Sequence, residues 1–384
     1  MAIKSVQPEE SFAQRGRLLH NWRGSALKSE STLHQLSPYI GKIKSSMAAS
    51  LVAQFTREGE VVYDPFSGSG TVALEAWLAR RRVIANDLSP YAALLSKAKL
   101  FPYASTEKAV ADVEQAAKEV SRTTEQIDLR FVPKWVRRFF HPETLRETLA
   151  WVTVLKNQRK DFLLSCLLGI LHHQRPGFLS YPSSHTVPYL RLKNFPRYRF
   201  PKLYAYRSVR HRLEAKVKRA LKRTPALDFS LSRRCYSKDA ASFAPAEQVD
   251  AIITSPPYMR QLDYGRDNRL RLWFLGEADW KALDKTISPS EADFMALMRR
   301  CFAHWRGILK PNGRCVLILG DRMSRTYKMP LADAIAEIAL NEVGGFSLQH
   351  KYTDSIPDIR RVRRNCRGSL SEIILTLRIG EKPN

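Results

Sequence analysis

The chain has 384 residues, 44% of them hydrophobic, which provides for an ordinary buried core in one large or two modest domains. No run approaches 18 apolar residues, which argues against a membrane span, and residues 1–10 lack the apolar core of a signal peptide, which argues against secretion. The five cysteines lack C-x-x-C spacing, which argues against a disulfide framework and a zinc ribbon. Lys and Arg number 63 against 37 Asp and Glu, and the net charge of +26 predicts a nucleic-acid partner, with a solubilising surface or a surface for an anionic membrane as the alternatives.

The chain first alternates short apolar runs with helical patterns. Residues 60–64 and 83–87 are predicted to be buried strands, and residues 71–82 and 90–100 are predicted to be the helices that follow them. A strand–helix repeat of this kind predicts a parallel sheet with helical crossovers, as in a doubly wound α/β fold. Residues 1–35 are mixed and polar, and we expect an irregular arm there.

This alternation stops between residues 101 and 230, where little of the sequence is typical of strands. Helical patterns cover residues 105–125, 142–175 and 208–224. Residues 176–208 are rich in Pro and aromatic residues and are predicted to be loop. We interpret this part of the chain as an inserted, mainly helical and basic region.

The α/β pattern returns after residue 231 and continues to the end of the sequence. Strands are predicted at 249–254, 314–320, 346–352 and 372–378, and helices at 290–308 and 330–341. We therefore predict three parts: an arm with the first part of a ligand-binding domain (1–100), the insertion (101–230) and the second part of the same domain (231–384).

A Gly-rich loop joins the first predicted strand to its helix and has the sequence Asp64-Pro-Phe-Ser-Gly-Ser-Gly-Thr71. Glycines permit a tight turn and a close backbone approach to a ligand, and the helix N-terminus offers free N–H donors. In doubly wound sheets, ligands bind at the carboxyl ends of the strands, where this loop is expected to lie. The loop lacks the Lys of a P-loop and the G-x-G-x-x-G spacing of dinucleotide sites, so a tight turn without a ligand is the alternative.

An acidic residue, Asp87, closes the second predicted strand about 20 residues after the loop. A carboxylate at this place can accept hydrogen bonds from both hydroxyls of a ribose. The alternative is that Asp87 caps the following helix. Because Ser89 is also available as an N-cap, we favour the ribose-binding role.

The sequence Thr254-Ser-Pro-Pro-Tyr258 follows another predicted strand. The exocyclic amine of a nucleic-acid base is a poor nucleophile, because its lone pair is delocalised into the ring, so a site that methylates it must align it and accept its N–H hydrogen bonds. Pro256 and Pro257 stiffen the backbone so that a carbonyl can point at the amine. The Ser255 hydroxyl can accept or donate, and Tyr258 can stack on a flipped base. A Pro-Pro turn that only ends the strand is the alternative.

Together these motifs resemble those of the AdoMet-dependent amino-methyltransferases of DNA, over roughly residues 30–100 and 234–380. The resemblance implies a Rossmann-like class I methyltransferase fold, S-adenosyl-L-methionine (AdoMet) as the cofactor, S-adenosyl-L-homocysteine as its product, and no metal. It likens His34–Lys42 to the segment that holds the methionine end of the cofactor. Asp239 resembles an acidic residue that meets the adenine amino group, and a helix cap is the alternative. The implied cofactor-binding residues are Tyr39, Asp64, Pro65, Phe66, Gly68, Gly70, Thr71, Asp87 and Asp239.

The first residue of the Ser-Pro-Pro-Tyr motif bears on the choice of base. Ser255 resembles the cytosine-N4 form, whereas adenine-N6 enzymes more often carry Asp or Asn there. Cytosine-C5 methylation needs a thiolate, usually in a Pro-Cys pair, and no cysteine here follows a proline. The resemblance therefore implies a site-specific cytosine-N4 methyltransferase of DNA. Methylation of adenine N6 in DNA, or of a base amine in RNA, stays open, and a non-catalytic nucleic-acid-binding protein is a remote alternative.

The role of the insertion does not follow from the resemblance, because many enzymes with this loop carry the two motifs in the reverse order. Residues 188–223 contain 13 Lys or Arg and one acidic residue, Glu214, with aromatic residues interleaved. Cations suit phosphates and aromatic rings stack on bases, so this segment is predicted to contact nucleic acid, with a solvated basic helix as the alternative. A second basic run at residues 360–367 is predicted to meet DNA phosphates, with a solvated loop as the alternative.

The expected partner is DNA, in the cytoplasm and away from membranes. Enzymes of this kind either have a cognate restriction endonuclease as a separate chain or stand alone, and the sequence leaves both open. It does not indicate an oligomeric state.

Overall fold

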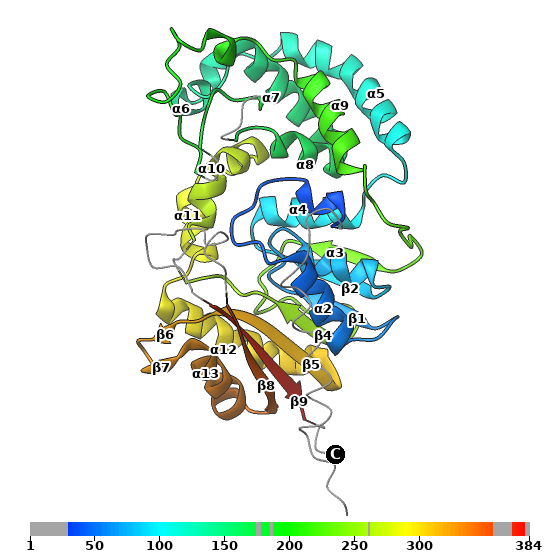
Figure 1. Ribbon diagram of the computed structural model, residues 1–384, viewed down its shortest axis with the longest axis vertical. Helices are drawn as coiled ribbons and strands as arrows, with labels where there is room; N and C mark the ends of the chain where they lie inside the picture. Colours follow the sequence, from blue (N-terminus) through cyan, green and yellow to red (C-terminus); the bar gives the residue numbers. More distant parts are fainter. Residues whose placement is uncertain (1–29, 174–177, 185–186, 260–261, 356–370, 381–384) are drawn as a thin grey trace, which may run out of the picture.

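A seven-stranded sheet with the order β3-β2-β1-β4-β5-β9-β8 organises the fold (Figure 1). The computed structural model of the protein describes residues 30–173, 178–184, 187–259, 262–355 and 371–380. The strands of the sheet are β1 (Val61–Asp64), β2 (Arg82–Asn86), β3 (Arg233–Tyr236), β4 (Val249–Thr254), β5 (Leu309–Gly320), β8 (Phe346–Ser355) and β9 (Ser371–Ile379). β9 runs antiparallel to both of its neighbours, and the other pairings are parallel. The predicted class I methyltransferase fold is thereby confirmed.

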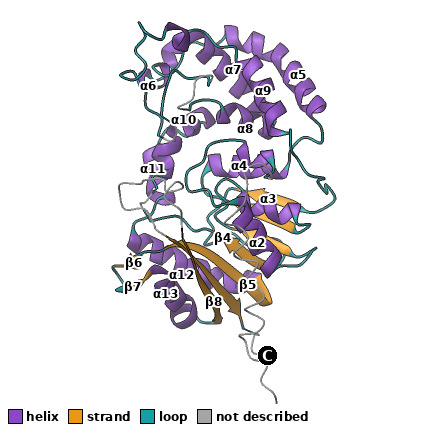
Figure 2. Ribbon diagram, in the orientation of Figure 1, coloured by secondary structure: helices purple, strands orange, loops and turns teal. Residues whose placement is uncertain are grey.

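Helices cover both faces of this sheet (Figure 2). One face carries α2 (Ser45–Phe55), α3 (Thr71–Leu78) and α4 (Pro90–Leu100), and the other carries α12 (Glu291–Ile308), α13 (Leu331–Glu337) and the π-helical turn η5 (Ile338–Val343). Successive side chains of a strand point to opposite faces. Accordingly, Val62 belongs to a first hydrophobic cluster, on the face of α2, α3 and α4, whereas Val61 and Tyr63 belong to a second cluster, on the face of α12 and α13. Both faces of the central strands are therefore buried.

A layer of helices lies beyond α4 and comes from the predicted insertion (Figure 1). Its main helices are α5 (Thr106–Glu125), α7 (Pro142–Asn157), α8 (Asp161–Gly169) and α9 (Val209–Ala220), with short turns η3 (Leu129–Phe131), α6 (Lys134–Arg137) and η4 (Pro201–Tyr204). The buried side chains of this layer join the first hydrophobic cluster of the sheet. Ser165 also donates a hydrogen bond to the carbonyl of Leu94, so the layer is packed directly onto α4.

Two further helices connect this layer with the carboxyl ends of the strands. They are α10 (Tyr264–Leu275) and α11 (Trp280–Ile287), and the sequence did not predict either of them. Arg271 of α10 is buried, and its Nε donates to the carbonyl of Leu168 in α8 at 3.2 Å. Gly276 ends α10 in a left-handed conformation, with φ of 102°, which suits glycine. The remaining elements are the 3-10 turn η2 (Thr32–Gln35) and a small hairpin of β6 (Met323–Ser324) and β7 (Met329–Pro330).

Several predicted boundaries differ from the structure. The predicted helix 142–175 is two helices, because the chain turns at residues 158–160, where Arg159 has a φ of 52°. The predicted helix 71–82 ends at Leu78, and Arg80, with a φ of 64°, turns the chain into β2. β3 was not predicted as a strand, since its side chains are only half-buried and lack an apolar pattern. No helix in the described part of the chain is both long and apolar enough to span a membrane.

Candidate functional site

The Gly-rich loop turns from β1 into α3 at the carboxyl edge of the sheet. Gly68 and Gly70 have positive φ values of 49° and 71°, which an L side chain rarely adopts. A Cβ atom on Gly70 would lie 2.8 Å from Cα of Ser96, so the close packing of this loop on α4 requires glycine there. The hydroxyls of Ser67 and Ser96 lie 2.9 Å apart and tie the loop to the same helix.

Asp87 follows β2 directly, and its carboxylate binds the backbone of the Gly-rich loop. Its Oδ2 accepts a hydrogen bond of 2.8 Å from N–H of Gly68, and its Oδ1 accepts one of 2.9 Å from N–H of Ser89. Burial raises the pKa of Asp87 to about 6, although these two hydrogen bonds oppose the rise. Each carboxylate oxygen retains further acceptor capacity toward the cavity. The alternative, in which Asp87 caps α4, is not met: Ser89 occupies the N-cap position of α4, without a capping side-chain bond, and Asp87 holds only the turn before it.

Asp64, at the end of β1, lies deepest among the acidic residues of the site. Its Oδ1 accepts a hydrogen bond of 2.6 Å from the hydroxyl of Thr254, which ends β4. Burial raises the pKa of Asp64 to about 7, and the hydrogen bond from Thr254 moderates the rise. The same Thr254 oxygen accepts from N–H of Phe66 at 3.3 Å. The Gly-rich loop and the Ser-Pro-Pro-Tyr motif are thereby joined at their roots.

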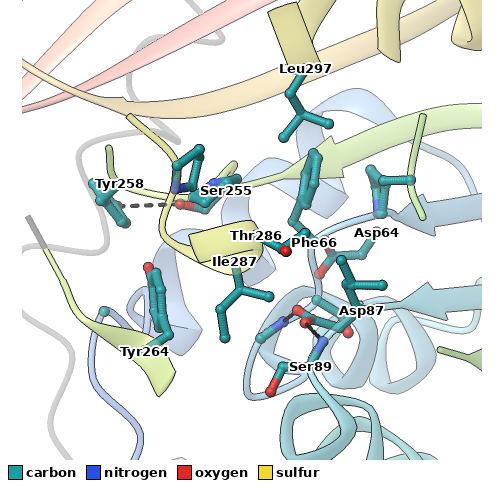
Figure 3. A pocket seen from close by; sticks show the side chains of 18 of the residues that line it. Asp64, Phe66, Asp87, Ser89, Ser255, Tyr258, Tyr264, Thr286, Ile287 and Leu297 are labelled. Carbon is teal, nitrogen blue, oxygen red and sulfur yellow. Dashed lines mark hydrogen bonds between the residues drawn. The ribbon is translucent and has the colours of Figure 1, made fainter. Parts of the chain in front are cut away.

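The Ser-Pro-Pro-Tyr motif leaves β4 next to the loop. The Ser255 Oγ lies 3.2 Å from the Tyr258 hydroxyl and 3.3 Å from the carbonyl of Ile318 (Figure 3). Serine has one hydroxyl hydrogen, so only one of these partners can receive it, and the lone pairs of Oγ stay able to accept. Burial, followed by the nearby charge of Glu372, raises the pKa of Tyr258 above its ordinary value. Tyr258 is therefore a neutral phenol at physiological pH.

The segment before α2 supplies a second aromatic side chain to the same region. The ring of Tyr39 stacks on that of Tyr264, with centroids 6.1 Å apart and planes at 28°. Nε2 of His34 lies 2.6 Å from a carboxylate oxygen of Glu75 in α3, and Nζ of Lys42 donates to the carbonyl of His34 at 2.8 Å. These contacts fix the segment 34–42 beside the loop, where the sequence placed it.

These residues line one cavity of about 570 Å³. From the predicted set, the cavity wall contains Tyr39, Asp64, Pro65, Phe66, Gly68, Thr71, Asp87, Asp239, Ser255, Pro257 and Tyr258. Gly70 and Pro256 do not line it: Gly70 packs on Ser96, and Pro256 is buried. The structure therefore brings the Gly-rich loop and the Ser-Pro-Pro-Tyr motif together around one space.

Asp239 lies at the rim of this cavity with its side chain 43% exposed. One carboxylate oxygen accepts from N–H of Ala241 at 3.0 Å, and the other lies 3.7 Å from a guanidinium nitrogen of Arg300. Asp239 thus caps a turn and not a helix, unlike the alternative prediction, and also lines the cavity.

Sequence reasoning missed the part of the wall that α10, α11 and α12 supply. Tyr264 begins α10, Ile287 ends α11 and Leu297 lies within α12, and all three point toward the cavity (Figure 3). Leu88, Ala240 and Leu297 contribute apolar side chains to this lining. These residues belong to no motif. Tyr264 and Ile287 reach the cavity through the packing of the two unpredicted helices, and Leu297 reaches it from α12, a helix that the sequence did predict.

Two predictions fall on parts of the chain that the structure does not describe. The arm is described only from residue 30 onward, and the basic run 360–367 lies outside the described residues altogether. Within the described ranges, no group of three or more His, Cys, Asp or Glu side chains is arranged to hold a metal ion.

Comparison with known proteins adds sequence relatives to this geometry. Residues 14–98 match a family described as DNA methylase, of the N6/N4 type, and the match includes the Gly-rich loop and Asp87. The type II methyltransferase M.MjaII of Methanocaldococcus jannaschii is 25% identical over 123 residues. This alignment covers 30% of the chain and 23% of that relative, so the chain matches about a quarter of the relative's length.

Solved structures similar in fold include TrmN from Thermus thermophilus and an rRNA methyltransferase from Streptomyces viridochromogenes. TrmN from Thermus thermophilus is 13% identical with a TM-score of 0.34, and the match covers 91% of this chain and 53% of TrmN. The rRNA methyltransferase aviRa from Streptomyces viridochromogenes is 12% identical with a TM-score of 0.35, and the match covers 93% of this chain and 96% of aviRa.

Proposed function

We propose that this chain transfers a methyl group from AdoMet to the exocyclic N4 amine of cytosine at specific sites in DNA. Its sequence relatives confirm the resemblance to the AdoMet-dependent DNA amino-methyltransferases. One observation carries the proposal. The Ser255–Tyr258 motif and the Asp64–Thr71 loop meet at a single cavity, with Asp87 on its wall.

The cavity fits AdoMet in size and in the chemistry of its wall. Its volume of about 570 Å³ lies within the range of small-molecule sites. The free acceptor capacity of Asp87 suits the two ribose hydroxyls, and the apolar side chains of Leu88, Ala240 and Leu297 in the cavity wall suit a purine ring. Asp239 at the rim is the acceptor we propose for the adenine amino group, and Tyr39 stands beside the methionine end.

AdoMet, when bound, supplies a methyl group on a positively charged sulfur, and the methyl carbon is the atom that the amine nitrogen would attack. The protein's task is to align that nitrogen and to draw its lone pair out of the ring. We assign the acceptor role to Ser255 Oγ and to the backbone carbonyls that Pro256 and Pro257 stiffen. Tyr258, a neutral phenol, stacks on the extruded base. Transfer would break the bond between the methyl carbon and sulfur and leave S-adenosyl-L-homocysteine. The methylated amine would then give up its proton to solvent, so a strong base is unnecessary.

The choice of cytosine rests on Ser255. A serine hydroxyl can accept from the N4 amine and can donate where a donor is needed. An aspartate at this place would only accept when ionised, and that is the residue type the adenine-N6 enzymes more often carry. Adenine N6 and a base amine of RNA are the competing substrates.

The wider setting stays a set of predictions. We propose DNA as the macromolecular partner, contacted through the helical insertion at residues 101–230. A cytoplasmic location and a cognate restriction endonuclease as a separate chain are predictions of the same kind.

The deciding experiment identifies the product. The purified protein is incubated with AdoMet and either mixed genomic DNA or total RNA, and the nucleosides are analysed by mass spectrometry. N4-methylcytosine from DNA is expected. The Tyr258→Ala variant, prepared identically, controls for a contaminating methyltransferase. N6-methyladenine would overturn the choice of base, a methylated base found only in RNA would overturn the substrate, and no product with AdoMet still bound would overturn the assignment of a nucleic-acid amine.

A further inference from the structure

A second cavity, of about 600 Å³, lies outside the cofactor site, between α6, residues 188–192 and the helices α10 and α11. We call it the aromatic groove. Its wall combines apolar and aromatic side chains with two arginines, chiefly Trp135, Arg138, Tyr189, Leu192, Arg269 and Trp280. Sequence analysis singled out the basic, aromatic-rich segment that begins at residue 188, but the proposed methyl transfer assigns it no site.

The apolar wall of this groove is unusually open to solvent. The Tyr189 side chain is 56% exposed and that of Leu192 is 49% exposed. α11 contains no buried residue, although Trp280, Leu283 and Ile287 follow one another at helical spacing and form its half-buried apolar side. Exposed apolar surface gathered in one concave place, with a polar rim, marks a binding site.

The aromatic groove and the cofactor cavity lie at opposite ends of α11. Trp280, at its first residue, lines the groove, and Ile287, at its last, lines the cofactor cavity (Figure 1). Seven residues of helical rise separate these two side chains by about 10 Å, which equals about three base steps of stacked DNA. A strand whose target base enters the cofactor cavity therefore passes close to the groove.

The charge around the groove suits a nucleotide. Arg138 is exposed at its edge, and residues 188–207, the part of the basic segment before α9, carry six Lys or Arg and no acidic residue. Nη2 of Arg269 donates to the carbonyl of Pro188, which fixes the start of this segment against α10. Open aromatic faces beside cations are the combination on which unpaired bases stack while their phosphates are neutralised.

We propose that the aromatic groove is a second base-binding site, which holds an unstacked base of the DNA strand a few nucleotides from the target base. The proposal rests on the proposed function for the position of the target. The groove binds through the faces of Tyr189 and Trp280, and Arg138 receives the adjoining phosphate.

The test measures the affinity for a strand with and without bases. The probes are a fluorescent oligo(dC) of about 12 nucleotides and an abasic oligomer of equal length, compared by anisotropy at about 50 mM salt. Tyr189→Ala and Trp280→Ala are expected to weaken binding of oligo(dC) by about five- to 150-fold, the range for one base stacked on one aromatic ring. Both variants should bind the abasic oligomer as the wild type does, and Trp280→Phe should retain affinity for oligo(dC).

The matched control is Tyr198→Ala. Tyr198 belongs to the same basic segment and is 89% exposed, but it does not line the groove, so its loss should change neither affinity. AdoMet binding by every variant reports an intact fold. Equal losses on both probes, no loss in either groove variant, or a wild type that does not bind oligo(dC) would each overturn the groove as a base site. The assay needs no methylation, so a base-dependent loss without N4-methylcytosine supports the groove and defeats only the proposed reaction.

Discussion

The hydroxyl of Thr254 donates a hydrogen bond of 2.6 Å to the buried carboxyl of Asp64. Thr254 ends β4 and Asp64 ends β1, and these two strands pair in parallel in the middle of the sheet. The bond therefore joins the residue before the Ser-Pro-Pro-Tyr motif to the first residue of the Gly-rich loop. Both motifs leave the sheet from this one junction, which sets the position of Ser255 relative to the cavity.

Removing the donor should destabilise the protein. Thr254→Val keeps the shape of the side chain but leaves the buried Asp64 without this partner, which costs about 1–3 kcal/mol of unfolding free energy. Thr254→Ser retains the hydroxyl and serves as the control, with a smaller loss expected. The measurement is denaturant unfolding at neutral pH, and a Thr254→Val variant as stable as the wild type contradicts a structural role for this bond.

The pKa of Asp64 predicts how stability depends on pH. Burial raises this pKa from 3.8 to about 7, so the folded protein keeps a proton that the unfolded chain releases. The stabilisation from that proton is fully present below pH 3.8 and is lost as the pH rises through about 7. Asp64→Asn keeps an acceptor for Thr254 but does not titrate.

The unfolding free energy of the wild type, relative to Asp64→Asn, should therefore fall as the pH rises from about 5 to 8. The comparison is made without AdoMet, so that ligand binding does not enter. A difference that stays constant with pH, or that grows, shows that the carboxyl is ionised in the folded protein across this range.

Strong local patterns made much of the fold predictable. β4 at Val249–Thr254 and α4 at Pro90–Leu100 have the bounds that the sequence predicted. Each is an apolar segment with a proline at or just beyond one end, so the local sequence predicts where the element begins and ends. The cofactor loop and Asp87 were recognisable for the same reason, since strand, loop and acidic residue follow one another along the chain.

Long-range packing decided the part of the site that the sequence did not predict. Gly265 allows α10 to approach α11 closely, because a Cβ there would lie 2.6 Å from the side chain of Asp284, and N–H of Gly265 donates to the Asp284 carboxylate at 2.7 Å. No periodic pattern in the sequence predicts this contact. Yet it is the contact that turns Tyr264 toward Tyr39 and brings Ile287 to the cavity.

Asp87 should control the affinity for AdoMet. Hydrogen bonds to a charged group contribute about 1.5–3 kcal/mol, so Asp87→Asn should raise the Kd for AdoMet about 10- to 150-fold in calorimetric titration. Because the pKa of Asp87 is raised to about 6, affinity should also fall as the pH drops below that value and the carboxylate is protonated. Asp239→Asn, at the exposed rim, is the matched control, with a smaller effect expected. Unchanged binding by Asp87→Asn excludes the ribose role.

Tyr258 should act through its ring more than through its hydroxyl. Tyr258→Ala removes the stacking surface, worth about 1–3 kcal/mol per base, and should lower kcat/KM for DNA about five- to 150-fold. Tyr258→Phe keeps the ring and should lose much less. The Kd for AdoMet should be unchanged in both, which separates the base from the cofactor. A Phe variant as impaired as the Ala variant would transfer the role to the hydroxyl and its contact with Ser255.

The basic residues next to the aromatic groove should account for most of the phosphate contacts. Lys193, Arg199 and Lys202 are exposed in the segment that borders the groove, whereas Lys218, Arg219 and Lys222 are exposed on or just after α9. Changing either set to alanine removes three positive charges, so the two triple variants have the same net charge.

Each phosphate contact contributes about 0.9 to the slope of log K against log salt, so loss of the first set should reduce that slope by about 2.7. The second set should change it less, because α9 packs among the insertion helices α5 and α8, away from the groove. The reverse ranking, measured with duplex DNA between about 50 and 200 mM salt, would move the DNA path from the groove to α9.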